Sequence, residues 1–179
     1  MKSLQQHIKE SFKIGRDKMI KHNYHPQTND KLIEILSKRL EKDKNADLND
    51  IDVSQITNMQ YLFQDLDPHN IDISEWDVSN VKSMFNMFLD CKNFNCDLSN
   101  WNVSNVEDMM GMFQNCKNFE GKGLEKWDVS KVKYMDGMFA RCEKFNCDLT
   151  YWNVSNVKWM GGMFDGCDSL KTVPSWYKD

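Results

Sequence analysis

The sequence has no apolar stretch close to the roughly 20 residues that a membrane-spanning helix requires, so no transmembrane segment is predicted. The formal net charge is −4 with no long run of one sign, which argues against nucleic acid or an anionic membrane as a partner. The N-terminal segment also lacks the apolar core and the small-residue cleavage site of a secretion signal. We therefore expect a cytoplasmic protein.

The residue patterns of catalytic and metal sites are also missing from the sequence. There is no CxxC pair, no Ser/His/Asp set, no pair of carboxylates in an otherwise apolar segment and no glycine-rich phosphate loop. His22 and His25 have the spacing of metal ligands, but no cluster of cysteine or acidic residues accompanies them. We predict a protein that is not an enzyme and that uses no metal ion or cofactor.

What the sequence does contain is a repeat. A segment that reads WDVSNVKSMFNMFLDCKNFNCDLS at its first clear copy recurs with steps of 25, 26 and 25 residues between the leading tryptophans, Trp76, Trp101, Trp127 and Trp152. A divergent copy begins at Ile51, its register extends back to Asp47, and Trp176 starts a sixth, incomplete one. Self-similarity at such a period is typical of repeat architectures.

The pattern within one copy predicts its secondary structure. With the tryptophan as position 1, position 2 is Asp or Asn and position 4 is Ser in all five copies, and these residues favour helix starts. Apolar residues then occupy positions 6, 9, 12, 13 and 16, which places one apolar stripe on a helix of about three turns. A short extended piece around position 23 completes the copy. The sequence thus predicts an α/β solenoid with short parallel strands on one face and helices on the other.

Two features depart from this regular pattern. The third copy has one extra residue in the segment 120–123, whose two glycines allow a bulged loop. Before the array, residues 29–44 have the apolar stripe of an amphipathic helix, with Thr28 or Asn29 as its N-cap. We expect this helix to cap the N-terminal end of the repeats, since the end of an array otherwise exposes apolar surface.

The first residues of the chain form a candidate docking segment. Leu4, Ile8 and Phe12 lie on one face of a short amphipathic helix, which either packs on the body of the protein or docks onto another protein. The predicted organisation is therefore a short amphipathic segment at 1–20, a capping-helix region at 21–46, and the repeats with a C-terminal end cap at 47–179.

The motif W-[DN]-V-S-N-V-x-x-M-x-x-M-F-x-x-C-x-x-F-N-x-D-L-S resembles the 25-residue repeat of the BspA-like leucine-rich repeat family, which also occurs in mycoplasma surface lipoproteins. The resemblance covers about 47–176 and implies a leucine-rich-repeat-like solenoid of about five repeats with a protein-binding role. Many relatives are bacterial surface adhesins, but this sequence has no secretion signal and no lipid-attachment cysteine. The N-terminal portion is similar to copies encoded by tailed phages of gut bacteria.

The invariant polar and aromatic positions are interpreted as scaffold. The cysteines at position 16 lie on the apolar stripe and are expected in the core as reduced thiols, although neighbouring copies could bring two of them within disulfide distance. The aspartates at position 22 are expected to accept hydrogen bonds from backbone or tryptophan N–H groups; a calcium site is the alternative. The tryptophans at position 1 are expected in the core with each indole N–H hydrogen-bonded.

The remaining positions are free to carry recognition. Tyr134 and Trp159, at position 8, and Glu75, Asn100 and Tyr151, at position 25, are the candidate partner-binding residues, because packing does not require them there. We expect a monomeric, non-enzymatic protein–protein interaction module whose protein partner is not identified by the sequence. The alternatives are a structural or cargo component of a phage particle, docked through its N-terminal segment and therefore virion-associated, and a surface adhesin.

Overall fold

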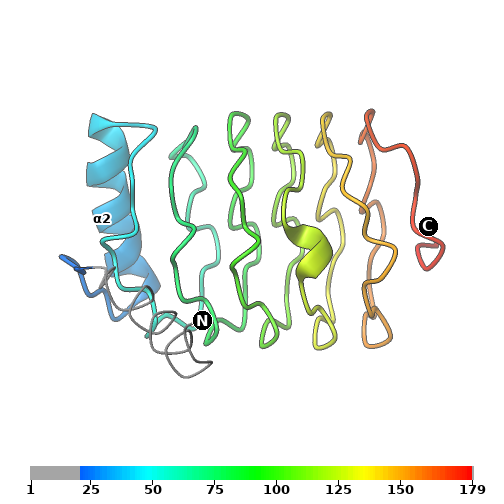
Figure 1. Cartoon of the computed structure of the whole chain (residues 1–179), viewed down its shortest axis with the longest axis horizontal. Helices are drawn as coiled ribbons and strands as arrows, with labels where there is room; N and C mark the ends of the chain where they lie inside the picture. Colours follow the sequence, from blue (N-terminus) through cyan, green and yellow to red (C-terminus); the bar gives the residue numbers. More distant parts are fainter. Residues whose placement is uncertain (1–20, 179) are drawn as a thin grey trace, which may run out of the picture.

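The computed structural model describes residues 21–178, so the candidate docking segment with Leu4, Ile8 and Phe12 lies outside the described residues. Each repeat makes one turn of the chain, which we call a rung, and successive rungs lie side by side along the long axis of the molecule (Figure 1). The five rungs begin at position 1 of each copy, at Ile51, Trp76, Trp101, Trp127 and Trp152.

The predicted α/β, leucine-rich-repeat-like solenoid, with strands on one face and helices on the other, is wrong. Within residues 21–178 the helices are α2 (Asn29–Lys42) and one 3-10 turn, η1 (Leu124–Lys126). The same residues contain no sheet, only isolated parallel β-bridges. Neither the three-turn helix nor the short strand expected in each repeat is formed.

The segment from position 9 to position 16 folds as consecutive turns instead of a helix. In the second rung, the amide of Met87 donates to the carbonyl of Met84 (3.1 Å), and the amide of Cys91 donates to the carbonyl of Phe88 (3.0 Å). Each of these turns contains a residue with a left-handed backbone, Asn86 (φ 52°) and Asp90 (φ 62°). An α-helix does not admit such residues, whereas a turn requires them at defined places.

Positions 11 and 15 have this left-handed backbone in all five rungs. The residues are Tyr61, Asn86, Gly111, Gly137 and Gly162 at position 11, and Asp65, Asp90, Asn115, Arg141 and Gly166 at position 15. Except for Tyr61 and Arg141, they are Gly, Asn or Asp, the residues that tolerate positive φ best. The sequence alone suggests that these two outward-facing positions vary freely, and this interpretation is wrong, because the backbone conformation restricts them.

Backbone hydrogen bonds join each rung to the next at alternate residues. In the second rung, for example, the amide of Met84 donates to the carbonyl of Asp108 and the amide of Phe88 to that of Met112, both at 2.9 Å. Parallel bridges connect position 8 of all five rungs in one continuous row: Asn58, Ser83, Asp108, Tyr134 and Trp159. The backbone at position 8 is thus held in register from one end of the array to the other.

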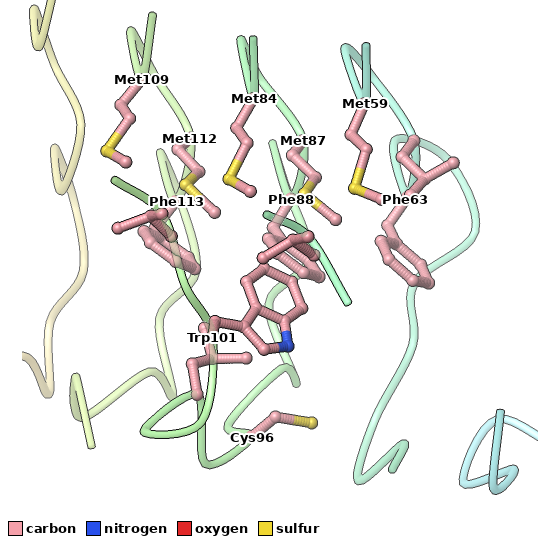
Figure 2. Packing of buried hydrophobic residues seen from close by; sticks show 14 of the residues in the cluster. Met59, Phe63, Met84, Met87, Phe88, Cys96, Trp101, Met109, Met112 and Phe113 are labelled. Atoms are coloured by element: carbon pink, nitrogen blue, oxygen red, sulfur yellow. The ribbon is translucent and has the colours of Figure 1, made fainter. Parts of the chain in front are cut away.

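The core runs through the middle of the rungs as ladders of like side chains. Figure 2 shows the position-9 methionines Met59, Met84 and Met109 in one row, with Phe63, Phe88 and Phe113 of position 13 in a second row. The rings of Phe63 and Phe88 lie 4.9 Å apart with an interplanar angle of 7°. These side chains are fully buried, so the apolar positions of the repeat supply the core.

Helix α2 covers the N-terminal end of the rungs (Figure 1). The helix expected over 29–44 is confirmed, and Thr28 is its N-cap, because its side chain accepts a hydrogen bond from the amide of Lys31. One face of α2 is buried in the common core through Leu32, Leu36 and Leu40. Asn29 also donates its side-chain amide to the carbonyl of Gln60 in the first rung (2.9 Å).

The extra residue of the third repeat lies where the loop 120–123 approaches neighbouring rungs. Gly121 and Gly123 have φ values of 86° and 92°, and η1 follows directly. A Cβ atom at Gly123 would lie 2.4 Å from the backbone nitrogen of Ser99, so the chain passes too close to the second rung for any side chain here. The two glycines accommodate the insertion, as the sequence predicts.

Candidate partner-binding surface

The tryptophans at position 1 belong to the scaffold. Their side chains are 3–5% exposed from Trp76 to Trp152. The indole N–H of Trp101 donates to the carbonyl of Ile73 (3.0 Å), and the other four tryptophans at position 1 make the equivalent bond. The expectation of core tryptophans with satisfied indole groups is confirmed, and these rings are not free to bind a ligand.

The position-16 cysteines are also structural. All six cysteines are free thiols, and Cys116 donates its thiol to the carbonyl of Phe88 in the preceding rung (3.0 Å). Burial raises the pKa of Cys116 well above its ordinary value and that of Cys167 to about 12. Since the thiolate is the reactive form, these groups are poor nucleophiles.

The position-22 aspartates accept backbone hydrogen bonds, as expected. Asp97 accepts from the amide of Ser99 (3.0 Å), and its second carboxylate oxygen pairs with Lys122 (2.7 Å). The hydrogen bond from Lys122 lowers the pKa of Asp97 to about 2. Within residues 21–178, no three His, Cys, Asp or Glu side chains lie close enough together to hold a metal ion.

The position-25 candidates are exposed but separate. Tyr151 is 90% exposed, and Glu75 and Asn100 are exposed as well. Asn100 lies at the edge of a hollow of about 460 Å³ that is lined mainly by backbone-bonded residues of positions 20–24. In the described part of the chain, no side-chain hydrogen bond, ion pair or ring contact connects these three residues with one another or with the position-8 candidates.

The position-8 candidates Tyr134 and Trp159 are brought together. They occupy the last two places of the position-8 row, which comprises Asn58, Ser83, Asp108, Tyr134 and Trp159. Their ring centroids lie 5.2 Å apart with an interplanar angle of 42°. Trp159 is 59% exposed, and the amide of Met135 donates to its carbonyl (2.8 Å). A large aromatic side chain is thus exposed on a fixed backbone.

Two residues at position 10, Asp136 and Gly161, lie beside this aromatic pair. The sequence analysis did not identify them as site residues. Asp136 Oδ1 accepts a hydrogen bond from the amide of Gly161 (3.3 Å), while Asp136 Oδ2 is buried without a hydrogen-bond partner. Burial raises the pKa of Asp108 in the position-8 row, and the charge of Asp136 adds to this effect, although the amide of Met110 bonds to the Asp108 carboxylate. Two carboxylates therefore lie next to the aromatic pair.

The histidine pair His22 and His25 forms no comparable cluster. The two rings are 6.1 Å apart in an edge-on arrangement, and His25 Nδ1 lies 3.2 Å from the carboxylate of Asp52. Asp52 also accepts a hydrogen bond from the amide of Ser54, as the position-2 residues of the other rungs do. These contacts connect the segment before α2 to the first rung.

Most of the chain matches a known protein family. The model of a family described as "Mycoplasma protein of unknown function, DUF285" matches residues 32–123 and, in a second match, residues 101–178. No curated protein and no solved structure matches the chain. Among the described residues, no helix has the length and apolar character needed to cross a membrane.

Proposed function

The chain belongs to the family described as Mycoplasma protein of unknown function, DUF285, and we propose that it acts as a non-enzymatic protein–protein interaction module through its position-8 row. The observation that carries the proposal is Trp159. The tryptophans at position 1 serve the core, whereas Trp159 is 59% exposed and packs against Tyr134 on the outside. Exposed aromatic side chains on a rigid backbone are favoured anchors of protein interfaces.

The rigidity of the row adds to this argument. The position-8 backbone is held by parallel bridges from Asn58 to Trp159, so the outward side chains keep fixed spacings. A surface that is ordered before binding loses little conformational entropy when a partner arrives. The row therefore suits recognition of an extended segment of a protein that lies across several rungs.

The chemistry of the cysteine thiols gives no support to catalysis. Burial raises the pKa of Cys96 and Cys147 to about 12, so little thiolate forms near neutral pH. We propose that the protein is not an enzyme. The resemblance of the repeat to the BspA-like family favours the same protein-binding role.

The other expectations stay predictions, because no finding tests them. These are the monomeric state, the cytoplasmic location, the domain boundaries, and the phage-particle and surface-adhesin alternatives. The phage alternative depends on the segment with Leu4, Ile8 and Phe12, outside the described residues. The position-25 residues remain a second candidate surface with a weaker basis, because they are exposed singly.

To test the proposal, peptides that bind the full chain are selected from a display library of short random sequences. Synthetic copies of the selected peptides are then titrated against three proteins: the unchanged chain, Trp159→Ala and Tyr151→Ala. We expect Trp159→Ala to weaken binding by about tenfold or more, as removal of an interface anchor does, and Tyr151→Ala to leave it unchanged. If only Tyr151→Ala weakens binding, the position-25 side is the interaction surface instead.

A further inference from the structure

We propose that the open space above Gly161 receives an arginine or lysine side chain of the partner, held between the carboxylate of Asp136 and the ring of Trp159. This inference rests on the proposed function, because it specifies the partner chemistry of the same surface. It makes the partner an extended basic segment rather than an apolar or acidic one.

The first step is the space itself. Position 10 is occupied by Gln60, Phe85, Met110 and Asp136 in the first four rungs, but by Gly161 in the fifth. A Cβ atom placed on Gly161 would meet one atom within 4 Å, Asp136 Oδ1 at 3.6 Å. Gly161 is exposed, and its φ is not in the left-handed region. Neither the backbone nor the packing requires glycine here, so the position has room for a side chain from outside.

The second step is charge. Asp136 lies at the border of this space and has no ion-pair partner in the described part of the chain. Its Oδ2 atom is buried without a hydrogen bond, and such an atom loses the free energy of hydration without compensation. Asp108 adds a second carboxylate nearby, and its pKa is raised first by burial and then by the charge of Asp136. The other oxygen, Asp136 Oδ1, borders the space at 3.6 Å from a Cβ position on Gly161, so a cation of the partner that contacts Oδ1 would supply the missing counter-charge.

The third step is the aromatic wall. Trp159 lies two residues before Gly161, and Tyr134 lies two residues before Asp136 in the neighbouring rung. A parallel bridge between Tyr134 and Trp159 holds the two rungs together here. A cation over the face of a tryptophan ring is attracted by the negative charge density of that face, and arginine can stack on the ring while its N–H groups reach a carboxylate. The two groups that recognise a basic side chain are therefore present together.

Two lysines directly precede the aromatic residues Tyr134 and Trp159 and must be included in the charge balance. Lys133 Nζ pairs with Glu107 at 2.5 Å, so its charge is compensated. Lys158, which directly precedes Trp159, is exposed and has no ion-pair partner among the described residues. It opposes a basic partner at longer range, so Lys158→Glu should strengthen binding, and the effect should shrink as salt is added.

The experiment uses the peptides selected on the full chain, each with its arginines and lysines replaced one at a time by citrulline or norleucine. We expect replacement of one of these basic residues in the peptide to weaken binding by roughly fivefold. We expect Asp136→Asn in the protein to weaken it by a similar factor. The matched control is Asp168→Asn, which removes an exposed carboxylate of the fifth rung outside positions 8 and 10. Gly161→Met should also weaken binding, because it fills the space.

A direct probe complements the peptides. Acetyl-arginine-amide is titrated into the 15N-labelled chain, with acetyl-norleucine-amide as the apolar control, and we expect shifts at the Gly161 amide and the Trp159 indole with arginine alone. Binding that depends on Trp159 but tolerates every basic replacement and Asp136→Asn would overturn this inference and leave the proposed function standing. Peptide binding that is indifferent to Trp159→Ala would overturn both.

Discussion

Phe113 packs between Phe88 and Phe139, with ring centroids 5.5 and 5.7 Å away and interplanar angles of 3° and 4°. Phe164, at the same position of the fifth rung, has a position-13 neighbour on one side, Phe139 at 5.8 Å, and it is only half-buried. The same side chain therefore has a different environment in the middle of the array and at its end.

We expect Phe113→Ala to lower the free energy of unfolding by about 3–5 kcal/mol, because it removes a fully buried ring and leaves a cavity between two rungs. Phe164→Ala should have a distinctly smaller effect, because Phe164 loses less buried area. Urea titrations of both variants provide the comparison. Equal losses at the two sites would mean that the ends and the middle of the array contribute alike.

Gly123→Ala should destabilise the protein by about 2 kcal/mol or more, since the new Cβ would lie 2.4 Å from the backbone nitrogen of Ser99 and the residue has a φ of 92°. Gly161→Ala is the matched control, and we expect a change within about 0.5 kcal/mol because its Cβ makes only an ordinary contact, with Asp136 Oδ1 at 3.6 Å. Thermal melts of the two variants measure the difference, and similar melting temperatures would contradict the close approach of loop 120–123 to the second rung.

Asp108→Asn should stabilise the protein at neutral pH. Because the folded-state pKa of Asp108 is raised above 3.8, mainly by burial, its contribution to stability is present at low pH and is lost as the pH rises through that pKa. Asparagine retains the acceptor for the Met110 amide and carries no charge. The gain should disappear in acid, where Asp108 is protonated.

Asp128 is the control for this pH dependence. The hydrogen bond from the Ser130 side chain lowers the pKa of Asp128, so the ionised form stabilises the folded state and its contribution is lost as the pH falls. Asp128→Asn should therefore destabilise the protein at neutral pH, with the opposite sign to Asp108→Asn. Denaturant midpoints measured from acid to neutral pH decide whether the two variants diverge in this way.

Alkylation with iodoacetamide should modify Cys147 and Cys167 before Cys116. The first two thiols are half-buried, whereas Cys116 is fully buried and burial raises its pKa well above the ordinary value. Mass spectrometry of the native protein at successive times gives the order. Reaction of Cys116 at the rate of Cys167 would show that the middle of the array opens as readily as its end.

The core of the array was predictable from the sequence because the repeat marks the buried positions directly. The fold class was not. The steps of three, one and three residues from Met84 to Cys91 fit a helix, but they fit consecutive turns equally well, since both bring every third or fourth residue to the same side. The deciding signal was the excess of Gly, Asn and Asp at positions 11 and 15, where the turns need positive φ.

The candidate surface was predictable in part, for a related reason. Tyr134 and Trp159 were identified because an outward position of the repeat carried aromatic residues that the core did not need. Asp136 and Gly161 were missed because neither stands out within its own copy. Their role in the candidate surface depends on a contact between rungs, in which Asp136 accepts a hydrogen bond from the amide of Gly161.

The hydrogen bonds between rungs restrict which insertions and deletions the gene for such a repeat protein can tolerate. A duplication or deletion of one complete repeat restores every bond between positions 9–15 of one rung and positions 8–14 of the next, whichever copies are joined. An insertion of any other length shifts this register, unless it falls in a segment such as 120–123, where glycines accommodate it. The number of repeats is therefore the quantity that unequal recombination can alter freely, and each such event would lengthen or shorten the position-8 row by one residue.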